Sequence, residues 1–226
     1  MKLRNITKKS ARRYEDGCAT AHALDLLGER WALLVMRELM FGPRRFGDLR
    51  ASLPALSANV LTQRLEGLEA AGVVQRTRLP PPASVQVYEL TEWGLEAEPI
   101  VLALGRWGAR SPDLDPNLPF SAISMMLSFR AMFDAKRARG VTVCLTFRFG
   151  AETFSVVVRD EAITCERGLR ADADVTISGQ PAAVAGAVYG FATLADMEAE
   201  GTLTIEGDRA AWRRFAGIFQ LPPKAG

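Results

Sequence analysis

A row of polar side chains between Ser57 and Gly72 has the types and spacing needed to hydrogen-bond the edges of DNA bases. The row consists of Asn59, Thr62, Gln63 and Glu66. These residues recur every three or four positions, so a helix places them on one face. The opposite face carries Leu61, Leu65 and Leu68. Asn and Gln can pair bidentately with adenine, and Thr can contact a base or the thymine methyl. The alternative is a solvated polar face on an ordinary amphipathic helix.

The residues around this row predict a helix-turn-helix followed by a β-hairpin. Ser57 is a good N-cap because its hydroxyl can accept a hydrogen bond from a free amide of the first turn. Gly72 suits the position just past the helix end. A shorter helical pattern and a Pro-containing turn precede the helix, and two strand-like runs joined by a Pro-rich tip follow it. In this arrangement the second helix enters the major groove.

Basic side chains on both sides of the helix suit the phosphate backbone. Arg44 and Arg45 precede it, and Arg76 and Arg78 lie beside the hairpin tip, where a wing meets phosphate. The complete set of predicted DNA-contacting residues is Arg44, Arg45, Ser57, Asn59, Thr62, Gln63, Arg64, Arg76 and Arg78.

Residues 18–110 resemble an HxlR-type winged helix regulator. The matching segments are LLGERW at 26–31, RRFGDL at 44–49, SANVLTQRLEGLEAAGVV at 57–74 and YELTEWG at 88–94. The resemblance implies a domain that binds double-stranded DNA and forms a homodimer. The chain departs from the family pattern at Ala19, where the family usually has Pro after the cysteine.

The resemblance also makes Cys18 a redox candidate, because some HxlR-type proteins carry a redox-sensitive thiol at this position. Such a thiol reacts when a cation or a helix N-terminus lowers its pKa. The alternative is an inert buried cysteine.

An apolar stripe at helical spacing follows the wing, in a helix predicted from Thr91 to about Gly108, in which Pro99 could introduce a kink. The stripe could pack on its own domain or pair with the same helix of a second subunit, and the HxlR resemblance favours pairing. The predicted dimerisation residues are Trp93, Ile100, Val101, Leu104 and Trp107.

A Pro-rich linker at 111–119 separates this part from a second domain at 120–222. The pattern there predicts a helix over about 120–139 and then alternating strands. Further helices are expected at 181–191 and after Asp208. The fold class is therefore α+β, with an N-terminal winged helix-turn-helix followed by an antiparallel sheet that helices cover on one side.

The segments DADVTISGQPAAVAGAVYG at 172–190 and GTLTIEGDRAAWRRFAGIF at 201–219 resemble a sterol-carrier-protein-like domain. The resemblance implies a hydrophobic tunnel that takes a lipid or another apolar ligand. The alternative is that the same side chains fill a packed core. The predicted ligand-binding residues are Met126, Phe133, Phe147, Phe149, Phe154, Tyr189, Trp212, Phe215 and Phe219.

Charge is distributed unevenly along the 226 residues. Residues 1–111 have a net charge of +4 (16 Lys and Arg against 12 Asp and Glu), and residues 112–226 have −2 (12 against 14). The basic part is the one with the winged helix pattern, as DNA binding requires. Residues 1–17 form a basic N-terminal arm that could contact DNA or be a solvated terminus.

The remaining composition points away from catalysis. The single histidine, His22, and three widely separated cysteines give no catalytic set, no metal site and no cofactor motif. The absence of a long apolar run predicts no membrane partner and a cytoplasmic location.

The function predicted from the sequence is a dimeric, sequence-specific transcriptional regulator whose second domain binds an apolar effector. Two alternatives stay open. The second domain could serve only for dimerisation or docking, or the chain could be a lipid-carrier-like protein with an attached DNA-binding domain.

Overall fold

The computed structural model describes residues 14–116 and 118–226, so most of the predicted N-terminal arm lies outside the described residues. These residues form two compact units. The first contains the described residues up to Leu39 and Pro43–Gly94, and the second contains Met40–Gly42 and Leu95–Gly226. The division thus falls ahead of the Pro-rich segment 111–119.

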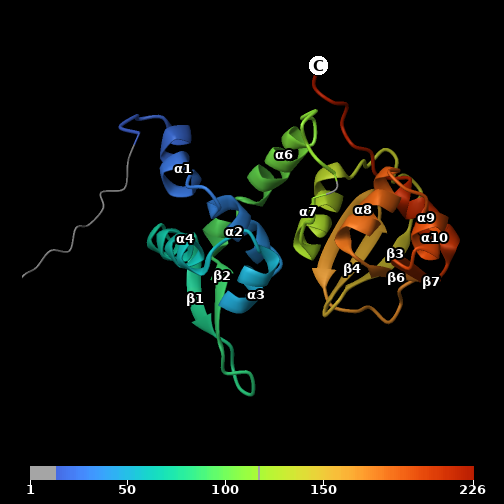
Figure 1. Cartoon of the computed structure of the whole chain (residues 1–226), viewed down its shortest axis with the longest axis horizontal. Helices are drawn as coiled ribbons and strands as arrows, with labels where there is room; N and C mark the ends of the chain where they lie inside the picture. Colours follow the sequence, from blue (N-terminus) through green and yellow to red (C-terminus); the bar gives the residue numbers. More distant parts are fainter. Residues whose placement is uncertain (1–13, 117) are drawn as a thin grey trace, which may run out of the picture. The chain divides into compact units, whose positions relative to one another are not determined.

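The first unit has the order of elements expected of a winged helix (Figure 1). Its elements are α1 (Ala19–Leu27), α2 (Ala32–Leu39), α3 (Phe46–Ser52), α4 (Ala58–Ala70), β1 (Val74–Arg78) and β2 (Gln86–Leu90). The short helix α5 (Glu92–Leu95) follows. Strands β1 and β2 pair antiparallel, and their hairpin extends away from the helices.

Helix α4 forms where the sequence predicts it. The Ser57 hydroxyl accepts a hydrogen bond from the Val60 N–H at 3.3 Å, which confirms the N-cap. Leu61, Leu65 and Leu68 are fully buried. Gly72 ends the helical run with a φ of +73°, a conformation that glycine adopts without strain.

The buried carboxylate of Glu38 on α2 is linked through Arg44 to strand β2 of the hairpin. Glu38 is completely buried, and its carboxylate accepts hydrogen bonds from Arg37 and Arg44. The backbone of Arg44 exchanges two hydrogen bonds with that of Tyr88 on β2, at 2.8 and 2.9 Å. Burial of the charge is tolerated because both carboxylate oxygens have cationic partners.

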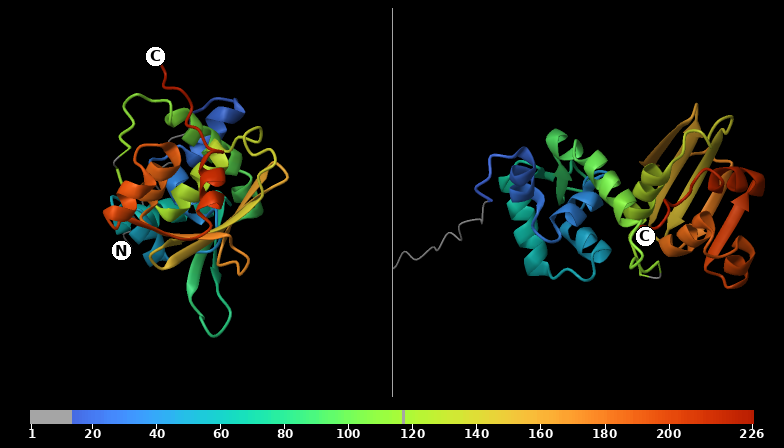
Figure 2. Two further views of the ribbon diagram at one scale, coloured as in Figure 1. Left: turned by 90° about the vertical axis from the view of Figure 1, so that its right-hand side faces the viewer. Right: turned by 90° about the horizontal axis from the view of Figure 1, so that it is seen from above.

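The second unit is a five-stranded sheet with helices on one face (Figure 2). Its strands are β3 (Val143–Phe149), β4 (Glu152–Arg159), β5 (Ala162–Arg167), β6 (Val175–Gly179) and β7 (Leu203–Gly207). Its helices are α6 (Glu98–Gly108), α7 (Ala122–Met132), α8 (Pro181–Tyr189), α9 (Leu194–Ala199) and α10 (Arg209–Ala216).

The sheet is mixed, not antiparallel as predicted. The strand order is β5-β4-β3-β6-β7, and β3 pairs parallel with β6 while the other neighbours are antiparallel. The reason is the position of strand β5 in the sheet. It pairs with β4 on the outer side, so the chain must cross over before β6 can join β3.

Two helices differ from their predicted lengths. The stretch after Thr91 is divided into α5 and α6, because Pro99 has no N–H to donate and lies in the first turn of a new helix. Helix α7 ends at Met132, since Phe133 is extended and the Asp134 carboxylate accepts a hydrogen bond from the Lys136 N–H at 2.9 Å.

Candidate nucleic-acid interface

The outward face of α4 is a continuous polar stripe. Its members Asn59, Thr62, Gln63 and Glu66 are all exposed. The Thr62 hydroxyl donates a hydrogen bond to the Ala58 carbonyl at 3.0 Å. That bond uses the hydroxyl proton, so Thr62 offers its methyl group and an acceptor to a ligand, whereas Asn59 and Gln63 retain complete amide groups.

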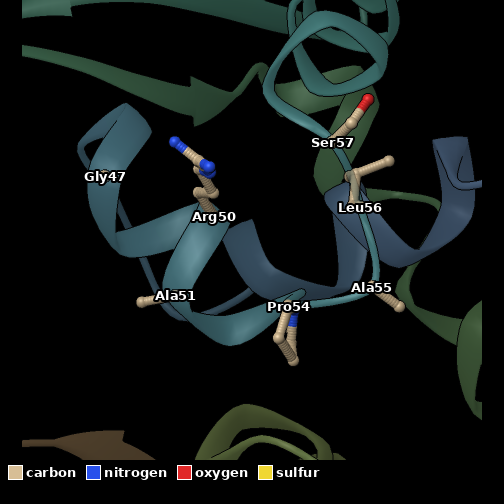
Figure 3. A pocket seen from close by; sticks show the side chains of 7 residues that line it. All are labelled: Gly47, Arg50, Ala51, Pro54, Ala55, Leu56 and Ser57. Carbon is tan, nitrogen blue, oxygen red and sulfur yellow. The ribbon is translucent and has the colours of Figure 1, made fainter.

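A hollow at the α3–α4 turn adjoins the start of this stripe (Figure 3). It is lined by Gly47, Arg50, Ala51, Pro54, Ala55, Leu56 and Ser57. The Arg50 guanidinium and the Ser57 hydroxyl project to the same side of the turn. The exposed Arg50 guanidinium therefore adds a positive charge near the N-terminus of α4, which is the positive end of the helix dipole.

The sequence pattern did not identify Arg50, because helical spacing does not predict that its side chain is exposed. Leu49 and Leu53 are the buried positions of α3 and its C-cap. Arg50 is four positions after Phe46 and three before Leu53, so helical spacing places it beside this apolar stripe, and its exposure is visible only in the structure.

The two arginines of the wing have different surroundings. Arg76 makes an ion pair with Glu69 at 3.1 Å, and its guanidinium lies 5.3 Å from the centre of the Tyr88 ring. Arg78 donates from Nε to the Ser84 carbonyl at 3.0 Å. A second hollow is lined by Arg76, Thr77, Arg78 and Gln86.

The other two predicted phosphate-binding arginines, Arg44 and Arg45, differ in their exposure to solvent. Arg45 is exposed at the start of α3, where its N–H donates to the Asp48 carboxylate at 3.3 Å. Arg44 is buried, and its guanidinium lies 3.3 Å from the Glu38 carboxylate. This differs from the predicted position, because a buried guanidinium paired with a carboxylate is not presented to phosphate.

Arg64 is also directed away from the polar stripe. Its Nη2 lies 3.1 Å from the Glu29 carboxylate, in the turn between α1 and α2. Its Nε is buried and has no hydrogen-bond partner among the described residues.

Cys18 is the exposed cysteine of the three and the N-cap of α1. The backbone N–H groups of Thr20 and Ala21, at the start of α1, lower the pKa of the Cys18 thiol. The other two cysteines have pKa values shifted in the opposite direction. Burial raises the pKa of the Cys144 thiol, and it raises the pKa of the Cys165 thiol to about 12.

The predicted ligand-binding residues lie together between the sheet and its helices. Phe147, Phe154 and Phe215 are fully buried, and the Phe215 ring centre is 5.8 Å from that of Phe147 and 4.8 Å from that of Phe219. Phe129, which was not predicted, contacts three of these rings. These separations are those of rings in contact, so the aromatic side chains form a packed core.

One polar pair lies at the margin of this core. The hydroxyls of Tyr189 on α8 and Ser128 on α7 are 2.5 Å apart. Burial raises the pKa of Tyr189 to about 12.

The predicted dimerisation residues of α6 form an exposed apolar stripe. Ile100, Leu104 and Trp107 follow one another at helical spacing, with Trp107 75% exposed, while Val101 is half-buried. Trp93, on α5, is exposed in the first unit.

Two absences concern the described residues alone. Within 14–116 and 118–226, no three His, Cys, Asp or Glu side chains gather as a metal site would require. In the same part of the chain, no helix has the length and apolar character needed to cross a membrane.

Comparison with known proteins identifies both parts of the chain. The model of the HxlR-like helix-turn-helix family matches residues 26–115, and the model of the alkyl sulfatase C-terminal domain matches residues 110–225. An HTH-type transcriptional regulator of Synechocystis sp. is 39% identical over 92 residues, which make up 41% of this chain and 68% of that protein. The regulator YybR of Bacillus subtilis is 34% identical over 110 residues, 47% of this chain and 86% of YybR.

A solved structure also matches. The reduced form of the transcriptional regulator YodB from B. subtilis is 32% identical, with a TM-score of 0.39, and the match covers 42% of this chain and 95% of YodB.

The winged helix and these relatives define a DNA-binding transcriptional regulator. The chain belongs to the HxlR-like helix-turn-helix family through its first part and to the alkyl sulfatase C-terminal family through its second. The sterol-carrier-protein-like domain was a different assignment for the second part, and it stays a prediction.

Proposed function

We propose that the chain is a sequence-specific regulator that inserts α4 into the major groove. The observation that carries this proposal is the exposed stripe of Asn59, Thr62 and Gln63, beside the hollow that holds Arg50. In this arrangement the amides read base edges and the Thr62 methyl contacts thymine. The exposed arginines Arg45, Arg50, Arg76 and Arg78 hold phosphates, which fixes the register of the helix on the duplex.

Selection from a pool of randomised DNA duplexes tests this proposal. The full chain should enrich an inverted repeat whose half-sites have centres about 10 base pairs apart, or a multiple of that spacing. Gln63→Ala should change the enriched bases at one position of each half-site, while Ala70→Ser, a substitution at the exposed end of α4, should leave the enriched sequence unchanged. Enrichment of no sequence by the wild-type protein would contradict the proposal.

We infer that the regulator acts as a homodimer. The α6 stripe supports this, because a free helix surface with Ile100, Leu104 and Trp107 exposed is costly unless another apolar surface covers it. Two copies joined by symmetry present two α4 helices, which fits the two half-sites of an inverted repeat.

For the second unit, we propose that an apolar effector enters by repacking the core. The supporting observation is the methionine content of α7, where Met125, Met126 and Met132 are buried on the same helix as Phe129. Methionine side chains adapt to new shapes more readily than branched ones. The close contacts between the phenylalanine rings favour the alternative, a docking or dimerisation module without a ligand.

Native mass spectrometry of the gently purified protein separates these two functions. Additional non-covalent mass that disappears under denaturing conditions supports the effector. A protein that carries no such mass, and gains none from a panel of fatty acids and aromatic compounds, supports the docking module.

Cys18 carries a second candidate function, regulation by oxidants. Its exposure and the helix N-terminus that lowers its pKa favour a reactive thiolate. If Cys18→Ser abolishes an oxidant-induced change in DNA affinity, the thiol is the sensor. If the change persists in Cys18→Ser, Cys18 has no such role.

A further inference from the structure

Arg64 is placed in a way that direct DNA binding does not explain. Its side chain is only 20% exposed, and its Nε is enclosed without a hydrogen-bond partner among the described residues. Removing a guanidinium N–H from water costs free energy unless a partner replaces the water. An arginine that served only to hold phosphate would keep its guanidinium in solvent, as the exposed Arg50 does.

The partner of Arg64 lies in a well-defined turn. Glu29 follows Gly28, whose N–H donates to the Leu24 carbonyl at 2.8 Å to close α1. Trp31 has a φ of +81°, a conformation that a large side chain adopts only when its surroundings impose it. The guanidinium of Arg30 lies 5.5 Å from the centre of the Trp31 ring. The backbone that carries Glu29 is therefore held in place, although the Glu29 side chain itself is 68% exposed.

We propose that the Glu29–Arg64 ion pair positions α4 for base reading. The inference rests on the proposed function of α4. Arg64 directly follows Gln63 in the sequence, so an anchor at Arg64 fixes the rotation of α4 about its axis. That rotation decides which edge of a base Asn59 and Gln63 can reach. Arg64 is thus a positioning residue, and it does not contact phosphate.

The effect of neutralising Glu29 on DNA affinity distinguishes this proposal from simple electrostatic repulsion. Removal of an acidic side chain from a DNA-binding domain normally strengthens binding or leaves it unchanged, because phosphates and carboxylates repel each other. If Glu29 holds the recognition helix in position, its neutralisation weakens binding instead. Loss of a positioning contact also leaves the salt dependence unchanged, since that dependence counts the phosphates neutralised by the protein.

The experiment uses the full chain and a duplex that the wild-type protein itself has selected. The variants are Glu29→Gln, Arg64→Gln, the double variant, and Arg50→Gln as the matched control for a phosphate contact. Affinity is measured over a range of salt concentrations. Glu29→Gln and Arg64→Gln should each weaken binding at least about threefold at every salt concentration, with the wild-type slope. The double variant should bind no more weakly than Arg64→Gln alone.

Arg50→Gln should instead reduce the slope of log affinity against log salt by about 1. The proposal is overturned if Glu29→Gln binds as tightly as the wild-type protein or more tightly, or if Arg64→Gln flattens the slope as Arg50→Gln does. Thermal melting checks that the variants are folded, and Glu29→Gln keeps the test decisive if Arg64→Gln unfolds. Failure of the wild-type protein to select any duplex contradicts the proposed function and is a separate result.

Discussion

At the residue scale, the arginines of the first unit fall into two groups by what they touch. Arg44 and Arg64 make ion pairs with Glu38 and Glu29 and are largely withdrawn from solvent. Arg45 and Arg50 are exposed. Because a buried guanidinium cannot reach phosphate without losing its carboxylate partner, only the exposed group is suited to DNA contact.

A stability measurement distinguishes the two groups. Arg44→Ala leaves the buried carboxylate of Glu38 without one of its cations, and we expect a loss of about 3–5 kcal/mol in the free energy of unfolding. Arg45→Ala, the exposed neighbour, should change that free energy by less than about 0.5 kcal/mol. Urea denaturation measures both. If Arg44→Ala were as stable as the wild-type protein and reduced the salt slope, Arg44 would be a phosphate contact after all.

Cys18 permits a prediction about pH. Its lowered pKa means that the thiolate forms at lower pH than in a free thiol, whose pKa is about 8.5. Cys144 and Cys165 have raised pKa values, so their thiolates form only at higher pH. Iodoacetamide near neutral pH should therefore modify Cys18 first, with a rate that rises at lower pH than for a free thiol. Peptide mapping identifies the modified residue, and modification of Cys144 or Cys165 before Cys18 would contradict the prediction.

At the element scale, aromatic side chains of α7, α10 and the sheet contact one another in the core of the second unit. Phe129, Phe147 and Phe215 are fully buried and touch one another. A packed core and a ligand tunnel respond differently to truncation of one such ring, because only the packed core loses many contacts.

Phe215→Ala should therefore lower the free energy of unfolding by about 3–5 kcal/mol. Phe191→Ala, at an exposed phenylalanine of the same unit, should change it by less than about 0.5 kcal/mol. Chemical denaturation provides the comparison. A cost below about 1 kcal/mol for Phe215→Ala would indicate empty space around the ring, as the tunnel hypothesis requires.

Local sequence signals predicted the elements with strong periodicity and clear caps. Helix α4 was predictable because Ser57, three buried leucines and Gly72 all agree. The bounds and pairing of β5 were not predictable, since the segment Ala162–Arg167 has few apolar residues to mark an inner face. The parallel pairing of β3 with β6 depends on where β5 pairs and on the crossover that follows it, and both are properties of the whole sheet.

The candidate site was predictable to a similar degree. The polar stripe of α4 follows from helical spacing alone, and it is exposed as predicted. The different positions of Arg44 and Arg50 did not follow from the sequence. They depend on which carboxylates the fold brings near each guanidinium, and Glu38 and Arg44 belong to different local segments.

At the scale of the whole molecule, reading an inverted repeat requires two copies of the chain. The α6 stripe is the surface on which this rests, because Ile100, Leu104 and Trp107 are all exposed. A charged side chain in the stripe should oppose its burial in a dimer.

Ile100→Glu and Trp107→Glu should each raise the dimer dissociation constant at least about tenfold. Leu114→Glu changes an exposed leucine outside α6 and serves as the control. Sedimentation velocity at several protein concentrations reports the dissociation constant. Dimers of unchanged stability in both α6 variants would show that this stripe is not the dimer interface.

If α4 reads DNA sequence, the protein must bind one duplex more tightly than another, and paired salt titrations measure this preference. The wild-type protein and the Asn59→Ala/Gln63→Ala variant are titrated on the selected duplex and on a scrambled duplex of the same composition. The wild-type protein should prefer the selected duplex by at least about a thousandfold, and the variant should lose most of that preference while keeping the same salt slope. Equal, weak affinity of the wild-type protein for both duplexes, or an unchanged preference in the variant, would contradict the account.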